Sequence, residues 1–161
     1  MPIYEGILKL DAEHYFEASR YRIETARQLY DKGKFSAAIY FAGVAVECIF
    51  RAYIYRKDLN FDSRHDLESM YKGTGMCDLI NSQERRNMCS YLGILWTRWK
   101  NNYRYTSDDR LRSEFSRLKY YKYDNGTFIQ GNHLKENSRM VVDAAVGIHA
   151  LGERKWQSKK K

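Results

Sequence analysis

Arg104 and Tyr105 are the residues of this chain best suited to bind a phosphate-containing ligand. An arginine guanidinium can hold a phosphate through two hydrogen bonds, and a tyrosine can stack on a base or hydrogen-bond to the ligand. Arg98, Lys100 and Arg110 lie nearby in the sequence and complete a candidate phosphate-binding set. The alternative is that Arg104 only interacts with the end of its own helix, where a cation is favoured.

The segment 83–122 contains this set and most of the positive charge of the chain. It holds ten Lys or Arg against four Asp or Glu, a net charge of +6 out of +8 for the 161 residues. Phosphate-pairing cations beside base-stacking aromatics are what single-stranded nucleic acid binding requires. The alternative is a solvated surface backed by core side chains. The aromatics interleaved with the cations are Tyr91, Trp96, Trp99, Tyr103, Tyr105, Phe115, Tyr120 and Tyr121.

Glu47 and His65 are the other residues whose types could support acid–base chemistry. Glu47 falls in an apolar stretch, where an unpaired carboxylate is costly, so we expect a structural ion pair with Arg22 or Arg51. His65 immediately precedes Asp66, and we expect a capping or packing role for it before a proton shuttle. If the protein is an enzyme, its candidate catalytic residues are Arg104, Tyr105 and His65.

No motif in the chain indicates a metal or an organic cofactor. Walker, G-x-G-x-x-G, H-E-x-x-H and G-x-S-x-G patterns are missing from the sequence. Cys48, Cys77 and Cys89 are odd in number and lack C-x-x-C spacing, which favours reduced thiols in the cytoplasm. No stretch approaches the roughly 20 apolar residues of a membrane span, and the start lacks a signal-peptide layout. We therefore expect a cytoplasmic protein with no membrane contact, no metal and no cofactor.

The spacing of apolar residues predicts the helices that must position these side chains. Long helices are expected at about 12–32, 35–57, 82–101 and 134–156. Shorter helices are expected before Gly73 and from Thr106 to about Leu118, and a hairpin or ordered loop at 121–129. The expected capping residues are Asp11, and the pairs Ser63 with Asp66, Asn81 with Glu84 and Thr106 with Asp109.

These elements predict one all-α domain over residues 1–161. Four long helices with short connections pack most simply as an up-and-down bundle. The helix at 35–57 is apolar almost all round, so we expect it at the centre, with Ala42 and Gly43 allowing close approach of a neighbour. The segment 157–161 is expected to be a flexible basic tail.

Pieces of the sequence, in order, resemble the HEPN domain family. The helical hairpin from Ala26 to Arg51 has the turn Leu29-Tyr30…Gly33-Lys34-Phe35 and then a small residue and a glutamate, as in HEPN domains. Arg64-His65-Asp66-Leu67 is similar to the "his-asp-leu" segment of the family, and Tyr103-Arg104-Tyr105 to its "tyr…arg-tyr" signature. A final amphipathic helix also stands in the expected place. The resemblance covers most of the chain, apart from an apparent insertion at about 106–131.

The resemblance implies a bundle that usually dimerises, with a polar cleft at the dimer seam. Many HEPN proteins are metal-independent ribonucleases in toxin or antiviral systems, often beside a small nucleotidyltransferase. Their catalytic signature is Arg-x4-6-His. The positions at this spacing after Arg104 are Asp109, Arg110 and Leu111, and no histidine of the chain follows an arginine in this way. Because cleavage needs a positioned acid and base, nuclease activity does not follow from the resemblance.

Our leading hypothesis is a HEPN-like module that binds nucleotide or single-stranded RNA without catalysis, as a dimeric accessory, toxin–antitoxin or defence protein. A homodimer is expected because the helix at 35–57 has surplus apolar surface. The resemblance also suggests a nucleotidyltransferase-type partner. The enzyme alternative is a divergent metal-independent ribonuclease. The remaining alternative is a protein-interaction scaffold whose basic face meets an acidic partner.

Overall fold

The first two helices form a hairpin whose ends are fixed by local hydrogen bonds. In the computed structural model, which describes residues 10–61 and 65–158, α1 (Ala12–Asp31) begins at Asp11. The Asp11 carboxylate accepts a hydrogen bond from the His14 backbone N–H at 2.9 Å, which satisfies an otherwise unpaired helix donor. Gly33 has a φ of +73°, which glycine adopts without strain, and α2 (Phe35–Tyr55) then packs back along α1. The predicted hairpin is confirmed.

The central helix is α2, as predicted, and four other elements cover most of it. Thirteen of its 21 residues are buried, because α1, α3, α6 and the 3₁₀ helix η2 (Asn101–Tyr105) all pack against it. By length and composition alone α2 could cross a membrane, so the expectation that no stretch is apolar enough for this is corrected. Most of its apolar window is buried by the bundle, as in the core helices of soluble proteins.

The middle of the chain contains two helices with well-defined starts. α3 (Leu67–Thr74) is capped by Asp66, whose carboxylate accepts hydrogen bonds from backbone N–H groups of the first turn. The expected Ser63–Asp66 capping box is therefore corrected, since Asp66 is itself the cap; Ser63 lies outside the described residues. A short 3₁₀ turn, η1 (Met76–Asp78), follows. α4 (Ser82–Arg98) begins with the predicted capping box of Asn81 and Glu84.

The end of α4 differs from the prediction in a way that matters for the site. The helix stops at Arg98, because Trp99 has an extended backbone (φ −120°, ψ 136°), and not at about residue 101. Tyr103-Arg104-Tyr105 therefore belongs to the separate η2, not to the end of a long helix. α5 (Asp108–Arg117) is capped by Ser107, whose hydroxyl accepts a hydrogen bond from the Arg110 backbone N–H. The expected cap at Thr106 is therefore corrected.

The last part of the chain is an ordered loop followed by the longest helix. Lys122 and Phe128 form a single antiparallel bridge around a turn in which Gly126 has a φ of +84°, consistent with the predicted hairpin or ordered loop. α6 (His133–Ser158) then runs the length of the molecule. Gln157 and Ser158 are helical, which shortens the expected tail; residues 159–161 lie outside the described residues.

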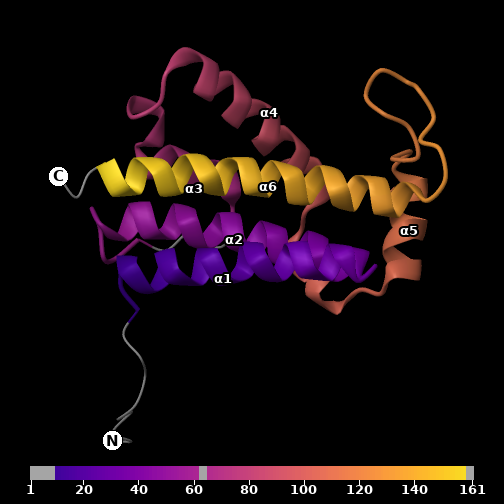
Figure 1. Ribbon diagram of the computed structural model, residues 1–161, viewed down its shortest axis with the longest axis horizontal. Coiled ribbons are helices and arrows are strands. Elements are labelled where there is room, and N and C mark those ends of the chain that lie inside the picture. The colour runs from indigo at the N-terminus through magenta and orange to yellow at the C-terminus, as the bar shows by residue number, and fades with distance from the viewer. Residues whose placement is uncertain (1–9, 62–64, 159–161) are drawn as a thin grey trace, which may run out of the picture.

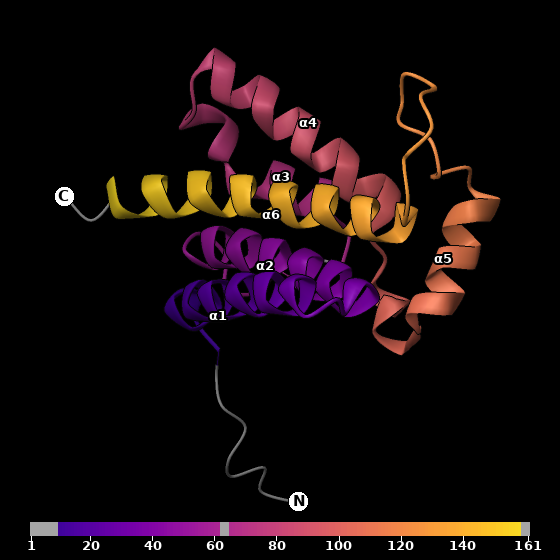
Figure 2. The same cartoon turned by 45° about the vertical axis from the view of Figure 1, so that its right-hand side comes forward.

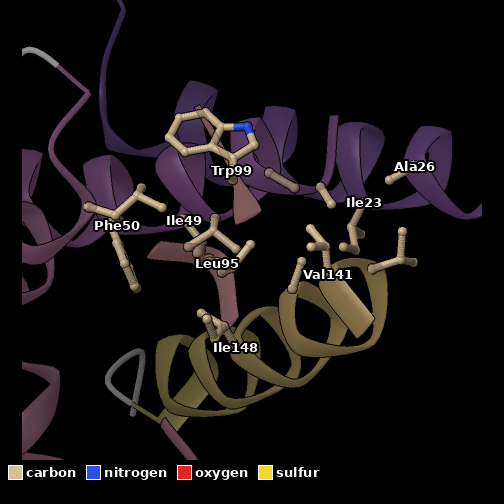
Figure 3. Close-up of a cluster of buried hydrophobic side chains, with 14 of the residues drawn as sticks. Ile23, Ala26, Ile49, Phe50, Leu95, Trp99, Val141 and Ile148 are labelled. Atoms are coloured by element: carbon tan, nitrogen blue, oxygen red, sulfur yellow. The ribbon is translucent and has the colours of Figure 1, made fainter. Parts of the chain in front are cut away.

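The long helices α1, α2, α4 and α6 form the predicted up-and-down bundle. Figure 1 shows that α1 and α4 run in one direction and α2 and α6 in the other. In the views of Figures 1 and 2, α6 lies between α4 and the α1–α2 pair, and α5 stands at the end of the bundle where α6 begins. Figure 3 shows core side chains from all four long helices converging: Ile23, Ala26, Ile49, Phe50, Leu95, Val141 and Ile148.

The apparent insertion at 106–131 packs on this bundle within one copy of the chain. The Asp108 carboxylate accepts hydrogen bonds from the backbone N–H groups at the start of α2, at 2.8 Å from Ser36. Arg98 donates through Nε to Asn137 Oδ1 at 2.7 Å, and Asn137 Nδ2 donates to the Tyr120 carbonyl at 2.7 Å. α4, α6 and the loop are thereby tied together around the buried Arg98.

Candidate functional site: a cationic pocket beside the central helix

Glu47 and Arg51 lie one helical turn apart on the same face of α2. The Glu47 side chain is only 8% exposed, and its Oε1 accepts from Arg51 Nη2 at 3.3 Å. This confirms the predicted ion pair with Arg51. Arg22, the other expected partner, lies over the ring of Phe41 at 5.8 Å from its centroid. A buried carboxylate is stable only when paired in this way, so Arg51 is held beside Glu47.

His65 completes the arrangement from the loop before α3. Its Nδ1 contacts Glu47 Oε1, the same oxygen that accepts from Arg51. Because an ionised carboxylate only accepts hydrogen bonds, Nδ1 carries the hydrogen and Nε2 is left for another partner. His65 has a φ of +66°, a region that non-glycine residues adopt where their surroundings hold them there. The Asp66 cap on α3 and the contact with Glu47 are the constraints on either side of it.

These residues line a pocket of about 210 Å³ between α1, α2, the loop before α3 and η2. We call it the Arg104 pocket. It contains two arginines and a histidine, whereas its carboxylate is already shared between Arg51 and His65. The pocket is therefore suited to an anion. Its polar lining consists of Tyr15, Tyr40, Glu47, Arg51, His65, Asn101 and Arg104.

Of the two first choices from the sequence, Arg104 lines this pocket, whereas Tyr105 is not among the lining residues and contacts Arg104 instead. Arg104 is exposed on η2, and its guanidinium stands over the Tyr105 ring, 4.7 Å from the centroid. Tyr105 is 78% exposed. Among the described residues no carboxylate lies within ion-pair distance of Arg104. Arg104 thus has hydrogen-bond donors that an incoming phosphate could use.

The other predicted binding residues do not gather at this pocket. Arg98 is only 3% exposed, and it packs on the Tyr120 ring while donating to Asn137. Arg110 lies on α5 in a different recess, with Asp109 and Glu114. Lys100 lines a recess that adjoins the Arg104 pocket. Lys100 and Arg104 do not belong to one long helix, because α4 ends at Arg98 and η2 begins at Asn101.

Several pocket residues were missed as site residues from the sequence. The sequence predicts Arg51 only as a structural partner of Glu47, although the spacing of four residues on one helix places the two side chains on the same face. Tyr15, Tyr40 and Asn101 come from three different elements. Only the packing of α1 and η2 on α2 brings them together, and local spacing does not reveal it.

Two side chains of the pocket, the Cys48 thiol and the Tyr15 phenol, are protonated at neutral pH. Burial, with a smaller contribution from Glu47, raises the pKa of the Cys48 thiol to about 11, which excludes it as a thiolate nucleophile. Burial, and then the neighbouring Tyr55, raise the pKa of Tyr15, so its hydroxyl can donate. Within residues 10–61 and 65–158, no group of three or more His, Cys, Asp or Glu could hold a metal ion.

The fold and the pocket define an all-α protein with a cationic pocket between its central helical hairpin and η2. The family model for the HEPN domain matches residues 12–146, most of the chain. The chain therefore belongs to the HEPN domain family, as its resemblance indicated, and that family is generally concerned with nucleotides or RNA. No curated protein and no solved structure gives a significant match.

Proposed function

We propose that this protein binds a nucleotide or single-stranded RNA in the Arg104 pocket. The supporting observation is that Arg51, His65 and Arg104 line one pocket whose carboxylate is already engaged. A phosphate placed there would take hydrogen bonds from the Arg104 guanidinium and meet a positive field from Arg51. The net charge of +6 in the segment 83–122 would increase the rate of encounter with a polyanion.

The test is a titration of labelled single-stranded RNA with Arg104→Ala and with Arg110→Ala as a matched control. Both substitutions remove one exposed arginine, but only Arg104 lines the pocket. Loss of a charge-assisted hydrogen bond should weaken binding by about 1–3 kcal/mol in Arg104→Ala. Arg110→Ala should cause a small loss that disappears at higher salt. Equal, small losses in both variants would indicate general charge attraction and contradict a specific site.

A metal-independent ribonuclease is the second candidate function, and one observation favours it. The Glu47–His65 contact leaves Nε2 of His65 without that partner, and His65 lines the pocket. Its imidazole could take the proton of a ribose 2′-hydroxyl as that oxygen attacks the phosphorus and the 5′-oxygen leaves with a proton from solvent. Arg104 would then stabilise the charge that develops on the phosphate. Incubation of single-stranded RNA with chelator, comparing the wild type with His65→Gln, tests this function. Uncleaved RNA that is nevertheless bound would favour the binding module.

We also propose a cytoplasmic, dimeric accessory role of the toxin–antitoxin or defence type, with a nucleotidyltransferase-type protein as partner. This proposal is supported by membership of the HEPN family. Co-expression with the product of the neighbouring gene, followed by purification through a tag on one chain, tests the partner. A scaffold with a basic face would copurify with a protein and would bind no RNA.

A further inference from the structure

A second recess adjoins the Arg104 pocket. We call it the Trp96 recess; it has a volume of about 420 Å³ and is lined by Trp96, Lys100 and Asp66 among others. His65 and Asn101 line both it and the Arg104 pocket. The two hollows are therefore neighbours across these two side chains, and a ligand longer than one phosphate could extend from one into the other.

Trp96 is an unusual residue to leave on this surface. It is 57% exposed, whereas Trp99, three residues later, is 6% exposed and donates through Nε1 to the Tyr40 carbonyl at 3.1 Å. In the described part of the chain, no ring–ring or cation–ring contact involves Trp96. A large aromatic side chain that remains mostly exposed in the folded protein is a common feature of binding surfaces.

The charges around Trp96 favour one class of occupant. Lys100 lies in the same recess, and Arg104 lies across the shared wall. The acid in the recess, Asp66, already accepts hydrogen bonds at the start of α3 and from the Ser69 hydroxyl, and the positive end of that helix offsets its charge. An aromatic surface flanked by cations matches a strand whose bases stack while its phosphates pair with Lys and Arg.

We infer that the Trp96 recess is a base-stacking subsite for a single-stranded nucleic acid whose phosphate occupies the Arg104 pocket. This inference rests on the proposed function, and it narrows the ligand to a stretch of single strand that crosses His65 and Asn101. Stacking on an indole ring is available to every base, so the subsite selects single strands without reading their sequence.

The experiment compares a short labelled oligouridylate with an abasic oligomer of the same length. The abasic oligomer keeps the phosphates and lacks the bases. Trp96→Ala should weaken oligouridylate binding by about 5- to 150-fold and leave abasic binding nearly unchanged, because only stacking is lost. Trp96→Phe should retain most of the affinity. Tyr21→Ala, which removes an exposed aromatic outside both hollows, is the matched control and should have no effect.

A fluorescence measurement gives an independent readout. Trp96 is exposed, whereas Trp99 and Trp156 are buried, so acrylamide should quench mainly Trp96. Bound oligouridylate should protect the wild type from quenching, and it should give no such protection in Trp96→Phe. Protection of equal size in both proteins would contradict contact between the bases and this ring.

The failures of the two proposals are distinguishable. If Arg104→Ala weakens binding and Trp96→Ala does not, the subsite is overturned and the proposed function stands. Equal losses of oligouridylate and abasic oligomer in Trp96→Ala also overturn stacking. If the wild type binds neither oligomer, both proposals fall. A changed oligomeric state in Trp96→Ala with unchanged RNA affinity would make this surface a protein contact instead.

Discussion

Glu47 holds the Arg104 pocket together, because a single carboxylate oxygen contacts both Arg51 and His65. Arg51→Met should lower the free energy of unfolding by about 1–3 kcal/mol, since it removes the arginine that pairs with the buried Glu47 carboxylate. Arg110→Met on the exposed surface of α5 should leave stability nearly unchanged. Chemical denaturation of both variants measures the difference. Equal stability of the two would mean that the buried pair contributes nothing to the fold.

His149 makes stability depend on pH. It is buried between α1 and α6, where its Nε2 lies 3.0 Å from the Ser19 hydroxyl. Burial lowers the pKa of His149; nearby Glu153 opposes this shift, and Arg20 adds to it. The unfolded chain therefore binds the proton more readily than the folded protein does. The stability that neutral His149 provides is present above about pH 6.5 and is lost as the pH falls below that value.

Denaturation curves between pH 7.5 and 5 check this dependence. His149→Gln should reduce the loss of unfolding free energy as the pH falls. The part of the loss that comes from His133 should remain, because burial lowers the pKa of His133 as well. Protein that grows more stable over this acid range would contradict a depressed pKa for His149.

At the scale of elements, Gly43 allows the chain after α4 to approach α2. A Cβ atom at position 43 would lie 2.1 Å from Trp99 Nε1, and the hydrogen bond to the Tyr40 carbonyl holds that ring in place. Gly43→Ala should therefore cost about 1–3 kcal/mol by overpacking, and it should also weaken RNA binding by displacing Lys100 and Asn101. Gly93→Ala in α4 is the control, because a Cβ there meets nothing within 4 Å.

In thermal unfolding, the two alanine variants should shift the melting temperature in opposite directions, downward for Gly43→Ala and upward for Gly93→Ala. Gly93→Ala should stabilise slightly through the higher helix propensity of alanine. Unchanged stability of Gly43→Ala would show that the Trp99 ring can move aside without cost.

The helices could be predicted from the sequence because their signals are local. Asp11, Asn81 and Glu84 cap their helices through bonds within four residues, and apolar spacing marked every long helix. The end of α4 could not be predicted, since neither glycine nor proline marks it. The chain leaves the helix there because Trp99 packs on a distant helix.

The candidate site was only partly predictable for the same reason. Arg104, singled out by its residue type, lines the pocket, while Tyr105 contacts the Arg104 guanidinium without lining the pocket. The burial of Arg98 depends on Asn137 and Tyr120, which come from later parts of the chain. The contact between His65 and Glu47 depends on how the loop before α3 packs against α2. Contacts between residues so far apart in the sequence produce no periodic pattern from which they could be predicted.

At the scale of the whole molecule, the homodimer stays a prediction, and its basis has changed. The apolar surface of α2, which suggested a partner copy, is covered by α1, α3, α6 and η2 within one chain. The expectation now rests on membership of the HEPN family. Light scattering at high micromolar concentration should give twice the mass of 19.2 kDa. A mass of one chain there would contradict the dimer.

The hydrogen bond from Trp99 to α2 has a consequence for how this pocket could evolve. Its acceptor is the main-chain carbonyl of residue 40, a group that every amino acid supplies. The side chain of Tyr40, which lines the Arg104 pocket, is therefore not needed for that anchor. Substitutions at position 40 could change which ligand the pocket prefers while the indole still secures the start of η2. Position 40 is accordingly a site at which selection, natural or in the laboratory, can vary specificity at low cost to the scaffold.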